Sequence, residues 1–275
     1  TCIRNPLPKL ASFRQWTEIG YNRNAVSAAC IAVRASTMSE APLAALEDKQ
    51  GINHNHPIAI LFRRPNPLMS ASDFIAFVST ALDIGGNCYI YKERSLAGTI
   101  LNLWPYSDEL VAPIVSDDGW VTGYAYDSGM VSKQWPASDV VHLRNPMFLD
   151  PLKPFMGQST VDKASSPIEI LNELEETVYT LAKDNAVPMG LLSAQEELSA
   201  EQQQYIKHRL RDKTRRGEPL VLGSMSYTQM GLNLQQLDFG TVRAQLESEI
   251  CGVFRVHPAV AMTFAGLQSS TYSNM

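Results

Sequence analysis

The chain has 275 residues, of which 45% are hydrophobic and 19% are charged, a balance typical of a folded globular protein and not of a disordered or fibrous one. The net charge of −5 argues against a protein that coats nucleic acid, because such binding needs a surplus of Lys and Arg at the phosphates. The apolar runs are far shorter than the ~20 residues of a membrane span, so we expect synthesis in the cytoplasm and no membrane partner.

The first part of the chain is predicted to be helical. Apolar residues recur at helical spacing over residues 22–39, which predicts a helix. The polar stretch over residues 47–56 predicts a loop. A second helix should follow, capped by Ser70 or Ser72 and ended by the glycine pair at 85–86.

Residues 88–143 change to a strand-like pattern. Five short β-rich runs alternate with turns, namely CYIYK, TILNLWP, LVAPIV, WVTGYAY and VVHLR. Asp118-Gly119 lies between two of these runs and predicts a hairpin with a type I′ turn. Trp104 and Trp135 are expected to pack in the core. Residues 1 to about 157 therefore indicate an α+β domain, with helices first and an antiparallel sheet after them.

Helical periodicity returns after residue 157. Ser166, Pro167 and Glu169 have the order of an N-cap, a first-turn proline and a capping-box acid. An earlier start at Ser159 would instead make Pro167 a kink or a restart. One apolar stripe follows, which predicts a helix face packed against a partner. It consists of Ile168, Leu171, Leu174, Val178 and Leu181.

A small α/β insert is predicted over residues 189–237. It holds a strand near residue 190, a helix capped by Ser199 and two short strands, the last around Tyr227. A second long helix should run from about residue 239 to residue 254 and stop before Pro258. Its predicted apolar face consists of Phe239, Val242, Leu246, Ile250 and Val253.

Charge is segregated between the first long helix and the helix of the insert. The first carries Glu169, Glu173, Glu175, Glu176 and Asp184 against Lys183. The second carries Lys207, Arg209, Arg211, Lys213, Arg215 and Arg216 against Asp212. A solvated helix face explains either run by itself. Their segregation favours a second interpretation, in which acidic residues let DNA slide and basic residues touch DNA or an acidic partner.

The sequence predicts no metal site and no cofactor. Four widely spaced cysteines without a CxxC pair indicate free thiols in a reducing compartment, and we interpret them as small buried apolar side chains. They are Cys2, Cys30, Cys88 and Cys251. His54 and His56 lack a third ligand nearby and are interpreted as solvated loop residues. His142 is interpreted as a satisfied core residue.

Motifs of catalysis are also missing from the sequence. The chain has no G-x-x-x-x-G-K-[ST], so ATP hydrolysis is not expected. GxSxG and HExxH are absent as well. We therefore predict a protein that is not an enzyme.

Several segments resemble the portal proteins of tailed double-stranded DNA phages, over nearly the whole chain. The most specific is ICGVFRVHPAVA at residues 250–261, followed by STYSN at 270–274, which is similar to the end of the second stem helix in that family. His257-Pro258 stands where the family usually has Pro-Pro, and Arg255 where it commonly has Gly. This departure indicates a diverged branch. The looser matches are GNCYIYKER, LWPYSDELVAPI, VVHLRNP, GQSTVDKA, and ELSAEQQQYIKHRL leading to PLVLG.

The resemblance implies an α+β, portal-like subunit whose α+β wing domain carries two stem helices and a small α/β clip inserted between them. The chain does not begin with Met and stops in a polar stretch, so we expect further residues at both ends and a missing crown. The implied boundaries are 1–158 for the wing, 159–188 for the first stem helix, 189–237 for the clip, 238–257 for the second stem helix and 258–275 for the start of a tunnel loop.

The resemblance also implies a function. The subunit would form a ring homo-oligomer, usually a dodecamer, at the portal vertex of the capsid in the virion, assembled in the host bacterial cytoplasm. Double-stranded DNA would pass through the ring during packaging and ejection. Implied partners are the large terminase, the head-tail adaptor and the major capsid protein.

Two groups of residues would meet DNA or the motor under this interpretation. The first is the clip, with the six basic residues of the insert helix. The second is the tunnel loop, with Gln268, Ser269, Ser270, Thr271, Tyr272, Ser273 and Asn274. Two alternatives stay open: an oligomeric scaffold without a DNA role, and an enzyme of unrecognised class.

Overall fold

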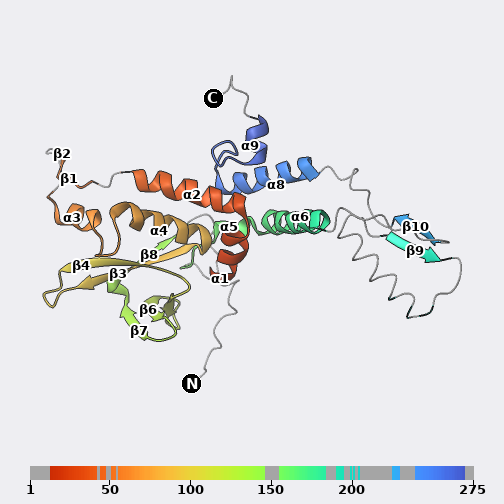
Figure 1. The fold of residues 1–275 in the computed structure, drawn as a ribbon. Coiled ribbons are helices and arrows are strands. Elements are labelled where there is room, and N and C mark those ends of the chain that lie inside the picture. The colour runs from red at the N-terminus through yellow and green to blue at the C-terminus, as the bar shows by residue number, and fades with distance from the viewer. Residues whose placement is uncertain are drawn as a thin grey trace. The chain divides into compact units, whose positions relative to one another are not determined.

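The computed structural model describes residues 13–41, 44–47, 51–53, 55–145, 155–183, 190–194, 199, 201, 204, 225–229 and 239–269. The chain divides into two compact units, the first made of residues 1–169 and 247–275 and the second of residues 170–246. Helices α6 (Ser165–Lys183) and α8 (Phe239–Phe254) carry the chain across the boundary between them (Figure 1). The first unit is thus assembled from two separate stretches of sequence.

The first unit begins with helices. α1 (Phe13–Trp16) leads through a wider π-helical turn (Thr17–Asn22) into α2 (Ala25–Glu40). Asn24 caps α2, because its side-chain oxygen accepts a hydrogen bond from the Ser27 amide over 2.9 Å. The helix predicted over residues 22–39 is confirmed.

The region after α2 differs from the prediction. Strands β1 (Leu46–Glu47) and β2 (Gly51–Ile52) form a short antiparallel pair, so the loop predicted over residues 47–56 is wrong at these positions. Helix α3 (Pro57–Arg63) follows. His56 caps it, because its Nδ1 accepts a hydrogen bond from the Ile58 amide over 3.2 Å, and the fixed φ of Pro57 suits the first helical position.

Helix α4 (Ala71–Ile84) confirms the second predicted helix. Ser70 is its N-cap and forms a capping box with Asp73: the Asp73 amide donates to the Ser70 hydroxyl, and the Ser70 amide donates to the Asp73 carboxylate. The chain leaves the helix at Gly85, and Gly86 takes a φ of +84°, a conformation that glycine adopts without steric cost.

Two three-stranded antiparallel sheets follow, in the orders β4-β3-β8 and β5-β6-β7. Their strands are β3 (Asn87–Arg94), β4 (Ile100–Ser107), β5 (Val111–Val115), β6 (Val121–Asp127), β7 (Ser132–Pro136) and β8 (Val140–Arg144). All five predicted strands are confirmed, and so is the α+β class. β7 was not predicted, because its residues SKQWP are mostly polar and exposed.

The hairpin between β5 and β6 is confirmed, but its turn type is wrong. Gly119 has a φ of +84°, whereas Asp118 is not among the residues with positive φ, and a type I′ turn needs positive φ at both central positions. The Gly119 amide donates to the Ser116 carbonyl over 2.9 Å, and the Ser116 amide donates to the Trp120 carbonyl over 2.8 Å. The loop is therefore one residue longer, with glycine alone in the left-handed region.

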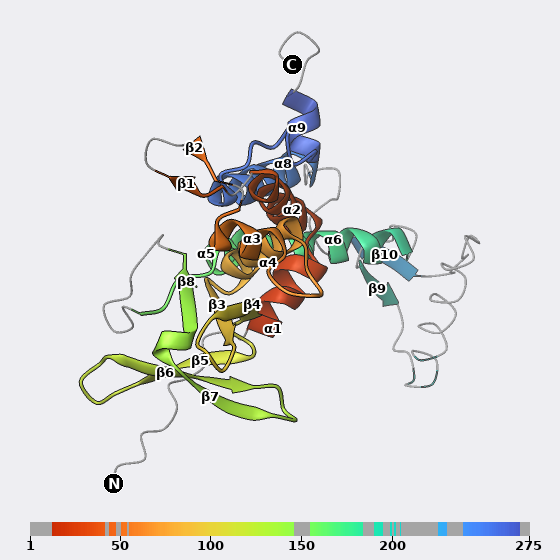
Figure 2. The same cartoon turned by 90° about the vertical axis from the view of Figure 1, so that its left-hand side faces the viewer.

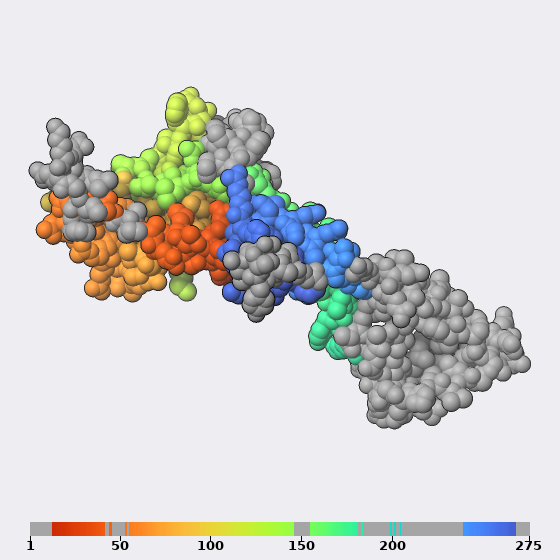
Figure 3. Space-filling view, turned by 90° about the horizontal axis from the view of Figure 1, so that it is seen from above, coloured from red at the N-terminus to blue at the C-terminus, as the bar shows by residue number. Residues whose placement is uncertain are grey.

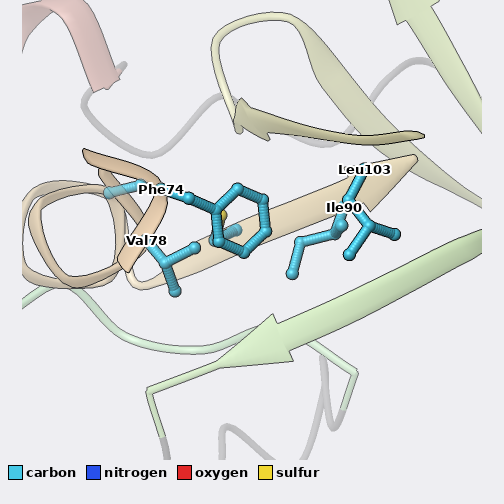
Figure 4. Close-up of a cluster of buried hydrophobic side chains, with 6 residues drawn as sticks. Phe74, Val78, Ile90 and Leu103 are labelled. Carbon is cyan, nitrogen blue, oxygen red and sulfur yellow. The ribbon is translucent and has the colours of Figure 1, made fainter. Parts of the chain in front are cut away.

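Helix α4 packs on one face of the first sheet. Phe74, Val78 and Ala81 of α4 form a buried cluster with Cys88, Ile90 and Leu103 of β3 and β4 (Figure 4). Figures 1 and 2 show the layers in order: α2, then α4, then the first sheet and the second sheet. This cluster holds the helices to the sheet by burying apolar surface.

The opposite face of β3 packs on the second sheet, because side chains alternate across a strand. Tyr89 is fully buried in a cluster with Val111, Tyr124, Trp135 and Val140. Trp135 therefore confirms its predicted core position. Trp104 is only partly buried, and its indole N–H donates to the Glu93 carboxylate over 2.8 Å. The prediction that Trp104 only packs in the core is therefore wrong, because its indole also makes a hydrogen bond at the edge of the core.

The long helix starts in two steps. Ser159 caps the short helix α5 (Thr160–Lys163) by accepting a hydrogen bond from the Asp162 amide over 2.9 Å. Helix α6 then restarts at Ser165 and contains Pro167 in its first turn. The restart alternative is confirmed, and Ser166 is a helical residue rather than a cap. Of the predicted stripe, Ile168 and Leu171 are buried, but Val178 is 44% exposed.

In the second unit, β9 (Gly190–Ala194) pairs antiparallel with β10 (Met225–Gln229), with Leu192 opposite Tyr227. These strands confirm the predictions near residue 190 and around Tyr227. The predicted insert helix and the strand at PLVLG lie outside the described residues.

Helix α8 confirms the second long helix. Its buried side chains are Leu246, Glu247, Ile250, Cys251 and Phe254, whereas the predicted face included Val242, which is 39% exposed. The helix ends before Pro258 in a Schellman arrangement: the Val256 amide donates to the Cys251 carbonyl over 3.0 Å, and the Arg255 amide to the Gly252 carbonyl over 3.1 Å. Arg255 has a φ of +57° there.

We predict that replacing Arg255 with glycine stabilises the protein. The left-handed conformation costs a non-glycine residue about 1 kcal/mol, and glycine removes that cost. Urea unfolding of Arg255→Gly should therefore show a free energy of unfolding about 1 kcal/mol higher. Arg255→Ala is the control, because alanine keeps a Cβ in the same conformation. An equal gain in both variants would mean that the arginine side chain, and not the backbone, is responsible.

Candidate functional site at the start of helix α6

Some of the predicted contact residues can be placed in the structure. All six basic residues predicted for the clip lie outside the described residues. Gln268 and Ser269 close the short helix α9 (Phe264–Ser269), which lies inside the segment 258–275 that is expected to begin a tunnel loop. The other five residues of the predicted tunnel loop, Ser270, Thr271, Tyr272, Ser273 and Asn274, lie outside the described residues.

The acidic residues of α6 mostly face solvent. Glu169, Glu173 and Glu176 are exposed, and Asp184 lies outside the described residues. Glu175 forms an ion pair with Arg243 of α8, with the guanidinium nitrogen 3.4 Å from the carboxylate oxygen. Both side chains of this pair are over 40% exposed, so it adds little stability. It does neutralise one of the negative charges that the sequence places on α6.

A buried polar junction joins the end of α4, Asn145 after β8 and the start of α5. Its hub is Asp83 at the end of α4, which is 1% exposed. The Asp83 carboxylate accepts a hydrogen bond from the Thr160 hydroxyl over 3.0 Å, and the Asp83 carbonyl accepts one from the Ser159 hydroxyl over 3.3 Å. The Asn145 side-chain amide donates to the Thr160 hydroxyl over 3.0 Å. The start of α5 is thereby fixed to α4 and to the end of β8.

Arg34 extends this junction to α8. Its Nε lies 3.2 Å from Asp83 Oδ2, so the two side chains form an ion pair, although the geometry is not that of a hydrogen bond. The terminal guanidinium nitrogen of Arg34 donates a hydrogen bond to the Phe254 carbonyl over 3.0 Å. Burial raises the pKa of the Asp83 carboxyl, and Arg34 opposes that rise. One guanidinium thus joins α2, α4 and the end of α8. In Figure 3 the red-orange α2 lies beside the blue end of α8.

The junction is tight because backbones meet there without side chains between them. A Cβ on Gly86 would meet the backbone of Gln158, and one on Gly157 would meet the carbonyl of Gly86. Asn87 ties the two segments together: its Oδ1 accepts a hydrogen bond from the Gly157 amide over 2.7 Å and contacts His142 Nε2 at 3.1 Å. The segment at residues 157–158 therefore passes Gly86 at a distance that only glycine permits.

Sequence reasoning did not single out Asp83, Asn87, Asn145 or Thr160. Three of these residues, Asn87, Asn145 and Thr160, nevertheless lie in segments that resemble the portal family. GNCYIYKER supplies Gly86 and Asn87, VVHLRNP supplies Asn145, and GQSTVDKA supplies Gly157 to Thr160. These segments are far apart in sequence, and the fold brings them into one hydrogen-bonded junction.

Two titratable side chains beside the junction, Asp108 and His142, have pKa values that are shifted in opposite directions. Burial raises the pKa of Asp108 to about 6, and burial lowers the pKa of His142 to about 4, helped by Arg144. Asn87 contacts both groups, since its Nδ2 lies 3.4 Å from Asp108 Oδ2. Asp108 Oδ1 has no hydrogen-bond partner within the described ranges.

We predict that Asp108→Asn is more stable than the wild type at neutral pH. The pKa of Asp108 in the folded state lies above its ordinary value of 3.8. Protonated Asp108 therefore contributes its full stability below about pH 4, and this stability is lost as the pH rises to about 6. Asparagine avoids the buried charge, so unfolding at pH 7 should require about 2 kcal/mol more, with little difference at pH 4.

Urea unfolding at several pH values checks the Asp108 prediction. His142 acts in the opposite sense, because its lowered folded pKa loses stability as the pH falls from 6.5 to about 4. The variant should therefore lose stability on acidification more steeply than the wild type. A constant difference between the two proteins from pH 4 to pH 7 would show that Asp108 does not titrate in this range.

The described part of the chain offers neither a metal site nor a membrane span. It contains no group of three or more His, Cys, Asp or Glu side chains placed to hold a metal ion. None of its helices combines the length and the apolar character needed to cross a bilayer. The junction is built to hold segments in place, through hydrogen bonds and close backbone contacts, rather than to bind a small molecule.

The fold is similar to several solved structures. It matches a subunit in the neck of the empty gene transfer agent (GTA) particle, computed with C6 symmetry, with a TM-score of 0.68 and 20% identity over 93% of this chain and 72% of that chain. An HK97 family phage portal protein from Corynebacterium diphtheriae matches with a TM-score of 0.64 and 11% identity, over 91% of this chain and 78% of that chain. These likenesses concern the fold.

Sequence comparison shows the family. The phage portal protein family matches residues 25–275, so the chain belongs to the phage portal protein family. A protein of Rickettsia bellii (strain RML369-C) is 27% identical over 271 residues, covering 93% of this chain and 68% of that protein. A protein of Rickettsia felis (strain ATCC VR-1525 / URRWXCal2) is 26% identical over the same shares.

Proposed function

We propose that this chain is a structural, non-enzymatic subunit of a ring at the capsid vertex through which double-stranded DNA enters and leaves the particle. The family match over residues 25–275 carries the proposal. A dodecameric ring is supported by a similar chain in the neck of the native GTA particle, computed with C12 symmetry, which has a TM-score of 0.67 and covers 98% of this chain. The ring would assemble in the host bacterial cytoplasm and remain in the virion.

The parts of the chain take distinct roles in this proposal. Residues 1–158 form the wing, residues 159–188 and 238–257 the stem helices, residues 189–237 the clip, and residues 258–275 the start of a tunnel loop. The separate second unit of residues 170–246 supports a clip that is inserted between two helices. The polar junction at Asp83 then fixes the first stem helix to the wing.

Charge supports the proposed path of DNA. Exposed glutamates of α6 (Glu169, Glu173 and Glu176) would repel phosphates if they face the channel, so that the duplex slides without being held. The six basic residues of the clip, from Lys207 to Arg216, would instead attract DNA or an acidic face of the large terminase. The same ring would dock the head-tail adaptor and contact the major capsid protein.

Electron microscopy of the purified protein tests the proposal. Negative-stain images of protein free of nucleic acid should show closed rings with a central hole wide enough for a DNA duplex. Rings without such a hole would favour an oligomeric scaffold with no DNA role. Monomers or compact dimers at every concentration would overturn the ring, and reproducible hydrolysis or group transfer by the pure protein would favour an enzyme.

A further inference from the structure

Two buried cysteines from distant parts of the chain face each other in the first unit. Cys30 lies on α2 and Cys251 on α8, 221 positions apart in sequence, and their Sγ atoms are 3.7 Å apart. Both side chains have no exposed surface, and both are free thiols. The portal role uses neither of them.

We propose that Cys30 and Cys251 form a disulfide bond when the folded protein meets peroxide, and that this bond locks the end of α8 to α2. The pair is a modification site that the family resemblance does not imply. Cys30 and Cys251 are the buried free thiols that the sequence indicates, and the proposal adds a reactive role to them.

The geometry favours closure within the existing fold. A disulfide needs the two sulfurs about 2.05 Å apart, so they must approach by about 1.7 Å from the present 3.7 Å. α2 and the end of α8 are already held together beside the pair, because Arg34 of α2 donates a hydrogen bond to the Phe254 carbonyl over 3.0 Å. Closing the bond therefore requires the two short side chains to move and does not require the helices to rearrange.

The chemistry balances with hydrogen peroxide as the oxidant. The hydrogen bond from Cys30 lowers the pKa of the Cys251 thiol, which favours Cys251 as the thiolate that attacks. Its sulfur forms a bond to one peroxide oxygen, the O–O bond breaks, and the hydroxide that leaves takes up the proton lost by the Cys251 thiol and becomes the first water. Cys30 Sγ then attacks the resulting sulfenic acid, the S–O bond breaks, and the second water leaves with the thiol proton. Two electrons pass from the thiols to the peroxide.

The consequence for a particle rests on the proposed function, whereas the formation of the bond does not. Thiols stay reduced in the cytoplasm, where a ring would assemble, and oxidising conditions prevail outside the cell. A bond formed after release would leave α8 free to adjust during assembly and would fix its end to the wing in the mature particle. The test below needs only the folded chain, so its outcome is independent of whether rings form.

The experiment exposes the native protein to hydrogen peroxide and then counts thiols after denaturation with dithionitrobenzoate. The chain has four cysteines, and we expect the count to fall from four to two. Under non-reducing denaturing electrophoresis the oxidised chain should migrate faster, because the bond closes a loop of 221 positions. Mass spectrometry should find the peptides of residues 30 and 251 joined, and the urea midpoint should rise until reductant is added.

Two variants make the result specific. Cys251→Ser removes one partner and should keep all three remaining thiols. Cys88→Ser is the matched control, since Cys88 is equally buried on β3 but lies in the apolar cluster with Phe74 and Ile90; this variant should still lose two thiols. The proposal fails if native wild-type protein keeps four thiols, if Cys251→Ser loses two, or if the joined peptides involve another cysteine.

Discussion

Replacing Asp83 with alanine should lower the free energy of unfolding by about 3 kcal/mol, because it breaks a buried ion pair from one side. The Asp83 side chain is 1% exposed, and its carboxylate lies 3.2 Å from Arg34 Nε. Its loss would leave the Arg34 charge without its partner and the Thr160 hydroxyl without its acceptor. Because the Arg34 side chain is 34% exposed, water compensates it in part, and the effect should fall at the lower end for buried pairs.

Asp139→Ala is the matched control for Asp83→Ala. Asp139 pairs with Arg94 at 3.0 Å, a slightly shorter distance, but its side chain is 28% exposed and that of Arg94 is 35% exposed. Exposed pairs contribute about 0.5 kcal/mol, so urea unfolding should barely distinguish Asp139→Ala from the wild type. Equal losses in the two variants would mean that Asp83 is not the hub of the junction.

Replacing Ile168 with alanine should lower the free energy of unfolding by about 3 kcal/mol, the usual result of deleting a buried aliphatic side chain and leaving a cavity. Ile168 lies in the first turns of α6 and has no exposed surface. It belongs to the first unit, so the variant should also weaken the attachment of α6 to that unit. Limited proteolysis at native conditions should then cut near the start of α6 more quickly.

Ile170→Ala controls for helix propensity and residue type. Ile170 stands two positions further along the same helix but is 51% exposed. The same substitution there should change the free energy of unfolding by less than about 0.5 kcal/mol, as for most surface sites. If Ile170→Ala is as damaging as Ile168→Ala, the face of α6 that packs in solution differs from the one described.

Elements whose boundaries depend on local chemistry were predictable from the sequence. The cap of α4, for which the sequence offered Ser70 or Ser72, the glycines after α4 and the β-rich run of β3 depend on a few neighbouring residues, and the sequence pattern predicted each of them. Helix α3 was not predicted, because the seven residues from Pro57 to Arg63 give too few turns for a periodic pattern. Helix α9 is shorter still and contains Gly266 and Ser269, which the composition indicated as loop.

The junction could not be predicted, because its members come together only in three dimensions. Nothing in the local sequence marks Asp83 as buried, and its 1% exposure depends on α2 and the start of α5 packing against it. The same reasoning explains the face of α8. A periodic pattern shows which residues can be buried, whereas Glu247 is buried because its carboxylate accepts a hydrogen bond from the Ala265 amide of α9 over 2.9 Å.

The discontinuous first unit has a consequence for synthesis on the ribosome. Ile250, Cys251 and Phe254 complete a core whose other residues, such as Cys30 and Ile31, are made far earlier. At about 5–20 residues per second, the 221 positions between Cys30 and Cys251 take roughly 10–40 s to translate. During that interval the apolar side of α2 has no α8 to cover it. The nascent subunit should therefore depend on chaperones until the ribosome has passed residue 254.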